Sequence, residues 1–225
     1  QNITHVISPV MHPIFADFQN DLSRLSDSYN KVVRFLAFIG FPLSVLLWFC
    51  SREIILIIFG EQWMPSVPVF QILSISVGIQ VILSTSGSIF QAANDTKSLF
   101  ICGVFSTLLN IIGILTGIFF FKTLEAVAWC ISLTFTINFV QCYIWMYKIT
   151  FKQDLQTFWK QFVSPILLTG ILIVCILPIY YVSDKYPIYI SLLLKGCISA
   201  IVYVAYLQIK GEYDIINLIK SKIKR

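Results

Sequence analysis

Apolar stretches long enough to cross a lipid bilayer recur along the whole of this sequence. A transmembrane helix needs about 20 mostly apolar residues, and the 225-residue chain offers six complete stretches of that kind. They are residues 33–50, 67–93, 98–121, 124–147, 162–181 and 188–207. Residues 3–18 form a shorter stretch that contains Pro13. The sequence therefore predicts an all-α fold, a polytopic transmembrane helix bundle with six complete spans and one N-terminal partial span.

Composition excludes several other classes of protein. The chain is 57% hydrophobic and only 12% charged, with a mean hydropathy of +0.83, which is too apolar for a soluble core. The net charge of +5 does not indicate nucleic-acid binding, because the basic residues are distributed according to the spans. The six cysteines stand singly and form no metal-ligand pattern with the two histidines. We expect no nucleic-acid partner, no metal and no cofactor.

The basic residues also predict an orientation. Twelve of the 16 Lys and Arg residues fall in connections on one side of the predicted spans, and three, Arg52, Lys122 and Lys185, fall on the other. Such residues concentrate on the cytoplasmic side of membrane proteins. We therefore expect a cytoplasmic C-terminus, with residues 210–225 as a basic tail. The chain begins with Gln1 rather than Met, so we expect it to be the C-terminal part of a longer protein.

The corner between the first two complete spans, residues 51–73, carries charges and aromatic rings. Gly60 permits a break in the backbone there, and Trp63 suits the level of the lipid headgroups. The corner predicts a short interfacial helix folded back between two spans. Within the spans themselves, Pro42 predicts a kink in the first, and residues 84–87 predict a bend in the second.

Polar residues inside the spans are candidates for function. Lys195 is the most costly of them, since a charge within a span costs a few kcal/mol or more unless it is paired or reaches water. Lys195 either snorkels or hydrogen-bonds between helices, or it contacts an anionic group of a substrate. Asn110 lies on a seam of small residues that predicts close helix packing. The other members of the seam are Gly103, Ser106, Gly113 and Gly117.

Further candidates lie near the N-terminal side. His5 and His12 are seven residues apart and share a helical face, where they either pack with hydrogen bonds or contact a polar substrate. Arg24 and Arg34 flank a predicted cytoplasmic entrance, either as ordinary topology charges or as groups that attract phosphate. The sequence contains no GxSxG, HExxH or phosphate-binding loop. We therefore expect that the chain is not an enzyme.

Several stretches together form the pattern of a known membrane-protein family. They are residues 10–15 (VMHPIF), the span around Pro42, residues 57–65 (IIFGEQWMP), residues 67–73 (VPVFQIL), and the span around Asn110 followed by residues 124–128 (LEAVA). Over residues 6–147 they resemble the C-terminal half of bacterial polysaccharide flippases. These are the O-antigen and teichuronic-acid type of the multidrug/oligosaccharidyl-lipid/polysaccharide superfamily.

The resemblance implies a fold, a function and partners. Members have two lobes with twelve or fourteen spans, and this chain is similar to the second lobe, with the N-terminal lobe of the same protein as a partner. They move undecaprenyl-pyrophosphate-linked oligosaccharide from the cytoplasmic to the outer leaflet of the bacterial plasma membrane by alternating access. The implied division is residues 1–147 as lobe helices, 148–209 as two additional helices and 210–225 as the basic tail. Where the family commonly has Gly, this chain has Ala126.

The resemblance also implies where a substrate would bind. By this resemblance the chain starts at the second helix of the lobe, and this first helix of the chain lines the central cleft, so His5, Ser8 and His12 are the residues expected to face it. Together with Arg24, Arg34 and Lys195, they are the predicted contacts of the lipid-linked oligosaccharide. The predicted structural residues are Pro13, Pro42, Gly60, Trp63 and Asn110.

Two other functions remain open at this point. A polytopic membrane enzyme of glycan assembly would require a long loop with clustered acidic residues and histidines, which the connections lack. A drug/cation antiporter of the same superfamily would require a carboxylate inside the membrane. Glu125 is the nearest candidate for that carboxylate, and it lies at a predicted interface.

Overall fold

The computed structural model describes residues 21–182 and 187–210, and they form helices joined by short connections. The helices are α2 (Leu22–Phe49), α3 (Ser51–Phe59), α4 (Val67–Leu83), α5 (Ser86–Ala92), α6 (Thr96–Thr116), α7 (Leu124–Trp145), α8 (Leu155–Val182) and α9 (Ile188–Lys210). A 3₁₀ segment, Glu61–Ser66, precedes α4, and π-helical turns, Gly117–Phe121 and Met146–Phe151, extend α6 and α7.

Six segments of the described chain are long and apolar enough to cross a membrane, by length and composition. They are Leu22–Phe49, Glu61–Ala92, Thr96–Phe121, Leu124–Phe151, Leu155–Val182 and Ile188–Lys210. The predicted all-α polytopic bundle with six complete spans is confirmed, and the chain is a multi-pass membrane protein. The predicted partial span and the tail after Lys210 lie outside the described residues.

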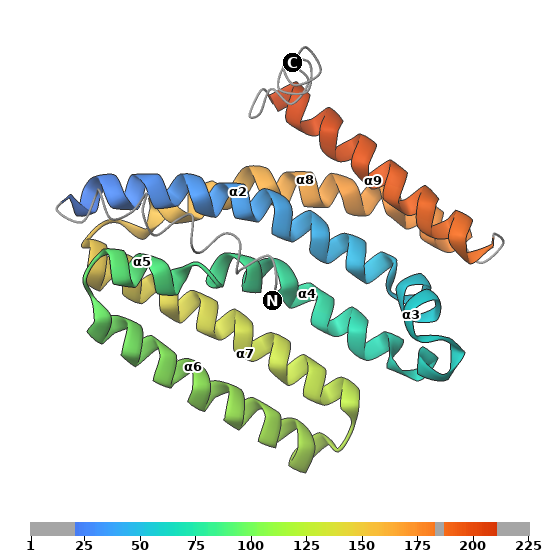
Figure 1. The fold of residues 1–225 in the computed structure, drawn as a ribbon, viewed down its shortest axis with the longest axis horizontal. Coiled ribbons are helices and arrows are strands. Elements are labelled where there is room, and N and C mark those ends of the chain that lie inside the picture. The colour runs from blue at the N-terminus through green and yellow to red at the C-terminus, as the bar shows by residue number, and fades with distance from the viewer. Residues whose placement is uncertain (1–20, 183–186, 211–225) are drawn as a thin grey trace.

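The long helices pack side by side in the order α6, α7, α4, α2, α8 and α9, with α2 and α4 in the middle (Figure 1). Buried side chains form two clusters. The larger joins α2, α5, α7 and α8 around Tyr29, Phe90 and Tyr143. The smaller joins α2, α8 and α9 around Phe38 and Leu172. Helices α2 and α8 contribute to both clusters, and α2 also packs against α4, so α2 is the central helix of the bundle.

The connections divide the bundle into two ends. We call one the α3 end, because α3 and the connection between α6 and α7 lie there, and the other the α5 end (Figure 1). Arg52 and Lys122 are at the α3 end, whereas most described basic residues are at the α5 end. The structure therefore gathers the basic residues as the sequence predicts, although which end faces the cytoplasm stays a prediction.

Helices α2 and α4 touch backbone to backbone. A Cβ atom added to Gly78 would lie 2.9 Å from the carbonyl oxygen of Gly40 and 2.6 Å from the Phe41 ring. The Gly78 N–H also donates a hydrogen bond to Ser44 Oγ at 2.7 Å. Small residues permit this close approach, which is a main source of helix association in membranes.

The small-residue seam on α6 is confirmed in its second half. A Cβ atom added to Gly113 would lie 2.4 Å from Thr134 of α7, and one added to Gly117 would lie 2.7 Å from the Cα atom of Val127. Thr134 Oγ1 also donates a hydrogen bond to Asn110 Oδ1 at 2.8 Å. The prediction is wrong for Gly103, which is exposed and has no atom within 4 Å of a Cβ atom added to it. The α6–α7 contact is therefore tightest towards the α3 end.

The start of α2 differs from the prediction, and the break between α4 and α5 agrees with it. The first complete span, predicted over residues 33–50, begins earlier than expected, because α2 runs as one helix from Leu22 with Pro42 inside. Its first turn is capped by Asp21, whose carboxylate accepts the Arg24 N–H at 3.1 Å. The bend predicted for residues 84–87 is confirmed as the break between α4 and α5.

Substitution of Gly78 by Ala tests the α2–α4 contact. We expect Gly78→Ala to lower the free energy of unfolding by about 1–3 kcal/mol, because the new methyl group meets main-chain atoms that cannot rotate away. The measurement is thermal unfolding of the purified protein in detergent. Gly103→Ala is the matched control and should be neutral or slightly stabilising. Equal effects of the two substitutions would contradict the proposed close contact.

Asp95 joins two helix ends and gives a pH-dependent test. Its carboxylate accepts the Ser98 N–H at 3.0 Å, capping α6, and the Thr150 hydroxyl at 2.7 Å. Burial opposes ionisation of Asp95, but the hydrogen bonds from Thr150 and Ser98 outweigh burial and hold its pKa below the usual value. A lowered pKa stabilises the fold above the unfolded pKa of about 3.9, and this contribution disappears as the pH falls through the folded pKa.

We expect Asp95→Asn to be less stable than wild type at neutral pH, by roughly 1 kcal/mol. The difference should begin to shrink below about pH 4, where the carboxylate of the unfolded chain takes up a proton, and should disappear once the pH has fallen through the lower pKa of the folded protein. Unfolding measured as a function of pH checks this expectation, with Thr150→Val as the second arm of a double-mutant cycle. A difference that stays constant with pH would refute the role of the charge.

Candidate functional site

The α3 end contains a buried ion pair between α3 and α9. The Lys195 ammonium pairs with Glu53 Oε1, and the two side chains are only 1% and 5% exposed. Lys195 Nζ also donates a hydrogen bond to the Phe49 carbonyl oxygen at 3.0 Å and lies 5.1 Å from the centre of the Tyr180 ring. Ser191 Oγ donates to the same Glu53 oxygen at 2.6 Å. One ammonium group therefore contacts α2, α3 and α8 from its place on α9.

The break between α2 and α3 explains why both charges are tolerated there. Helix α2 ends at Phe49 and α3 begins at Ser51, with only Cys50 between them. The last carbonyl groups of a helix have no partner within it and carry partial negative charge, which favours a cation. Glu53 lies in the first turn of α3, where free N–H groups favour an anion. The break therefore supplies an electrostatic complement to each member of the pair.

The other oxygen of Glu53 is less well accommodated. In the described part of the chain, Glu53 Oε2 is buried and has no hydrogen-bond partner. No group of three or more His, Cys, Asp or Glu side chains among the described residues could hold a metal ion. Removing one partner of a buried ion pair typically costs about 3–5 kcal/mol, because the remaining charge is uncompensated.

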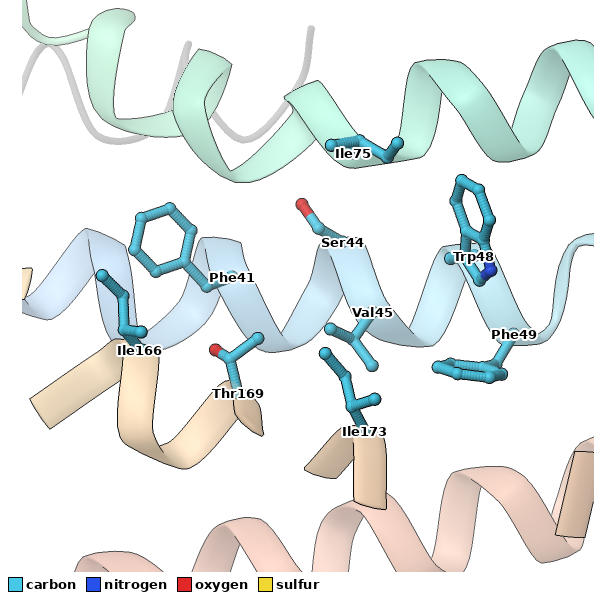
Figure 2. Close-up of a pocket in the computed structure, with 9 residues that line it drawn as sticks. All are labelled: Phe41, Ser44, Val45, Trp48, Phe49, Ile75, Ile166, Thr169 and Ile173. Carbon is cyan, nitrogen blue, oxygen red and sulfur yellow. The ribbon is translucent and has the colours of Figure 1, made fainter. Parts of the chain in front are cut away.

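An apolar groove of about 490 Å³ lies beside the ion pair, between α2, α4 and α8 (Figure 2). Phe41, Trp48 and Phe49 face it from α2. Ile75 faces it from α4, and Ile173 is one of the α8 residues that complete it. None of the described residues that line the groove is charged, so their chemistry suits hydrocarbon rather than sugar. Phe49 belongs to both features, since its ring lines the groove and its carbonyl binds Lys195.

Buried tyrosines join the helices at the α5 end. The Tyr29 hydroxyl lies 2.7 Å from that of Tyr143 and 3.1 Å from Thr85 Oγ1. The Tyr143 hydroxyl donates to the Ile82 carbonyl at 3.1 Å, an acceptor at the α4–α5 break that also receives the Thr85 hydroxyl at 2.8 Å. Tyr147 donates to Asn30 Oδ1 at 2.5 Å. These bonds connect α2 and α7, and Tyr29 and Tyr143 also bind the α4–α5 break, so we assign the network a structural role.

The substrate contacts predicted from the sequence are only partly visible. His5, Ser8, His12 and the structural residue Pro13 lie outside the described residues. Arg24 is exposed at the start of α2 and pairs with Asp21 at 3.2 Å, and Arg34 is half-buried on the same helix. Lys195 forms hydrogen bonds to other helices, which is one of the roles that the sequence predicted for it. A contact between Lys195 and a substrate stays a prediction.

Four of the predicted structural residues lie in the described part of the chain. Gly60 ends α3 with a φ of +89°, in the region that favours glycine. Trp63 is 53% exposed and its ring centre lies 6.2 Å from that of Phe59. Pro42 lies inside α2, and Asn110 accepts a hydrogen bond from α7. The interfacial position of Trp63 stays a prediction.

The sequence reasoning missed Glu53 as a site residue. It interpreted Glu53 only as a charge that ends an apolar run, whereas the residue is 4% exposed and pairs with Lys195. A signal was present, because a lysine within a span requires a carboxylate at the same depth. Glu53, Glu61 and Glu125 are the acidic residues at the α3 end of the described chain. Only the fold shows which of the three reaches α9.

Comparison with known proteins gives consistent sequence matches. The model of a family described as "Polysaccharide biosynthesis protein" matches residues 1–68. The teichuronic acid biosynthesis protein TuaB of Bacillus subtilis (strain 168) is 25% identical over 175 residues, which cover 75% of this chain and 34% of TuaB. The lipopolysaccharide biosynthesis protein WzxC of Escherichia coli (strain K12) is 30% identical over 112 residues, covering 50% of this chain and 23% of WzxC.

The fold matches a solved flippase structure. The lipid II flippase MurJ, in an inward closed conformation, superposes with a TM-score of 0.69 at 19% sequence identity, covering 93% of this chain and 43% of MurJ. The fold therefore defines a multi-pass helical membrane protein of the MurJ type. The sequence of the chain is therefore similar to proteins named for polysaccharide biosynthesis, and its fold is similar to that of a lipid II flippase. The chain spans well under half the length of each of these proteins.

A double-mutant cycle tests the ion pair. We expect Glu53→Gln and Lys195→Met each to lower the free energy of unfolding by about 3–5 kcal/mol, because each leaves one buried charge alone. The double variant should lose less than the sum of the two, since it removes both charges. Thermal unfolding in detergent measures all three. Glu125→Gln, at an exposed acidic residue in the first turn of α7, is the matched control and should change stability little.

Proposed function

We propose that the chain is the second lobe of a flippase that moves undecaprenyl-pyrophosphate-linked oligosaccharide from the cytoplasmic to the outer leaflet of a bacterial plasma membrane. Such transport serves polysaccharide or lipopolysaccharide biosynthesis. The observation that carries the proposal is that the sequence and the fold of the same chain match proteins of related function. Its sequence is similar to proteins of polysaccharide biosynthesis, and its fold is similar to a flippase of a lipid-linked saccharide.

The chemistry of the described helices supports this function. A pyrophosphate anion must cross about 30 Å of hydrocarbon, so a flippase needs a polar path for the headgroup while the lipid chain stays in apolar surroundings. The groove between α2, α4 and α8 offers apolar surroundings of that kind. For the headgroup, we propose that His5, Ser8 and His12 provide hydrogen bonds. Arg24 and Arg34 complete the proposed contacts by supplying positive charge, whereas the charge of Lys195 is buried and balanced by Glu53, so a contact between Lys195 and the headgroup would require that pair to open.

The distribution of charge supports an orientation for this function. We propose that the α5 end faces the cytoplasm, because most basic residues of the described chain lie there. The C-terminus is then cytoplasmic, with residues 210–225 as a basic tail against anionic lipid. In this orientation, α3 and the exposed ring of Trp63 lie at the outer interface.

The proposed activity belongs to a larger protein. The chain spans 34% of TuaB and 43% of MurJ, so we propose that a preceding lobe of the same protein completes the transport path. Residues 1–147 then form lobe helices, and residues 148–209 add two further helices. The names of the relatives describe biosynthesis and flipping, so we propose a transporter and not an enzyme.

A drug/cation antiporter remains the second candidate because of Glu53. This residue is the carboxylate inside the bundle that such a mechanism requires, and it is 4% exposed. Its charge is already balanced by Lys195, which weakens the case for a coupling site. The two candidates differ in cargo, so a transport assay separates them.

The full-length protein reconstituted into liposomes provides that assay. We expect it to translocate an undecaprenyl-pyrophosphate-linked oligosaccharide and not a cationic dye. His12→Ala and Arg34→Ala should each slow translocation at least several-fold if they meet the headgroup. Lys97→Ala, at an exposed basic residue of the same end, is the control. Dye transport without saccharide transport would favour the antiporter, and wild-type rates in both variants would overturn the site assignment.

A further inference from the structure

The oxygen atoms around Lys195 form the ligand set of a small cation. They come from the Glu53 carboxylate, the Phe49 carbonyl and the Ser191 hydroxyl, and the face of the Tyr180 ring lies on another side. We propose that the α2–α3 break is a monovalent-cation site and that the ammonium group of Lys195 is its built-in occupant, in place of an ion from solution. This proposal does not depend on which substrate the protein carries.

The backbone of the site favours a cation independently of Glu53. Phe49 is the last residue of α2, so its carbonyl is at the negative end of a helix and points to Nζ at 3.0 Å. Carbonyl groups at the ends of interrupted helices, inside a membrane bundle, are typical ligands for transported or structural monovalent cations. Here the same arrangement binds an ammonium group of the chain itself.

The bonding capacity of Glu53 shows that the site is not saturated by Lys195. Glu53 Oε1 accepts from both Lys195 and Ser191, while Oε2 is buried without a hydrogen-bond partner in the described chain. An ammonium group approaches one oxygen along an N–H direction, whereas a bare cation can bind both oxygens of a carboxylate. The unused oxygen is therefore the feature that a metal cation would satisfy and the lysine does not.

If the ammonium group of Lys195 is removed, a cation from solution should bind in its place. Without Lys195, the buried Glu53 charge is uncompensated, which is strongly unfavourable. A short side chain also leaves the space of the lysine stem open for a cation and its water. Methionine is uncharged and only one atom shorter than lysine, so it fills the space of the lysine stem. Lys195→Ala and Lys195→Met therefore remove the same charge but differ in whether a cation can enter.

The experiment compares thermal unfolding of the purified full chain in chloride salts of Na⁺, Li⁺, K⁺, methylammonium and N-methylglucamine at equal ionic strength. We expect the Tm of wild type to be independent of the cation. The Tm of Lys195→Ala should rise by roughly 3 °C or more with at least one small cation relative to N-methylglucamine, and the rise should saturate. Lys195→Met and the double variant Glu53→Gln/Lys195→Ala should show no such rise.

Three results would overturn the proposal. The first is a folded Lys195→Ala whose Tm is the same in all five salts. The second is an equal cation effect in the Glu53→Gln/Lys195→Ala variant, which would show that the effect arises elsewhere. The third is that no folded Lys195→Ala protein is obtained in any of the five salts, because a small cation should replace the lost positive charge. Saccharide transport is not measured, so none of these results bears on the flippase proposal.

Discussion

The ion pair between Glu53 and Lys195 decides how the helices meet at one end of this bundle. Hydrocarbon offers no water to a charged group, so a lysine on a membrane helix must find its partners within the protein. Lys195 finds them on α2 and α3, with the Tyr180 ring of α8 as a further neighbour. Helix α9 packs mainly against α8 at the edge of the row. The pair therefore links this outer helix to the centre of the bundle.

The rest of the row is joined by the two clusters of buried apolar side chains and, between them, by short polar and backbone contacts. Gly40 and Gly78 bring the main chains of α2 and α4 together, and tyrosine hydroxyls connect α2 with α7 at the opposite end. Many large apolar side chains remain exposed on the outer surface, where lipid would cover them. This division of roles explains why so much of an apolar chain is not buried in its own interior.

The sequence predicted the number of spans, the break at residues 84–87 and the gathering of basic residues, because all three follow from local composition. It could not predict the partner of Lys195, since Glu53 is 142 positions away and two other acidic residues lie at the same end. Gly103 shows the same limit, because its place on the helical wheel did not reveal that it lies outside the contact with α7. The groove was also invisible, since three helices distant in sequence create it.

The meeting of Gly40 and Gly78 limits the motions open to the bundle. Side chains can exchange rotamers and let one helix slide over another, but here two main chains touch and Ser44 binds the Gly78 amide. A shift of α2 along α4 would drive the neighbouring side chains into that contact. The two central helices are thus confined to a single register, and any change in the shape of the bundle must leave them together and displace the helices on either side.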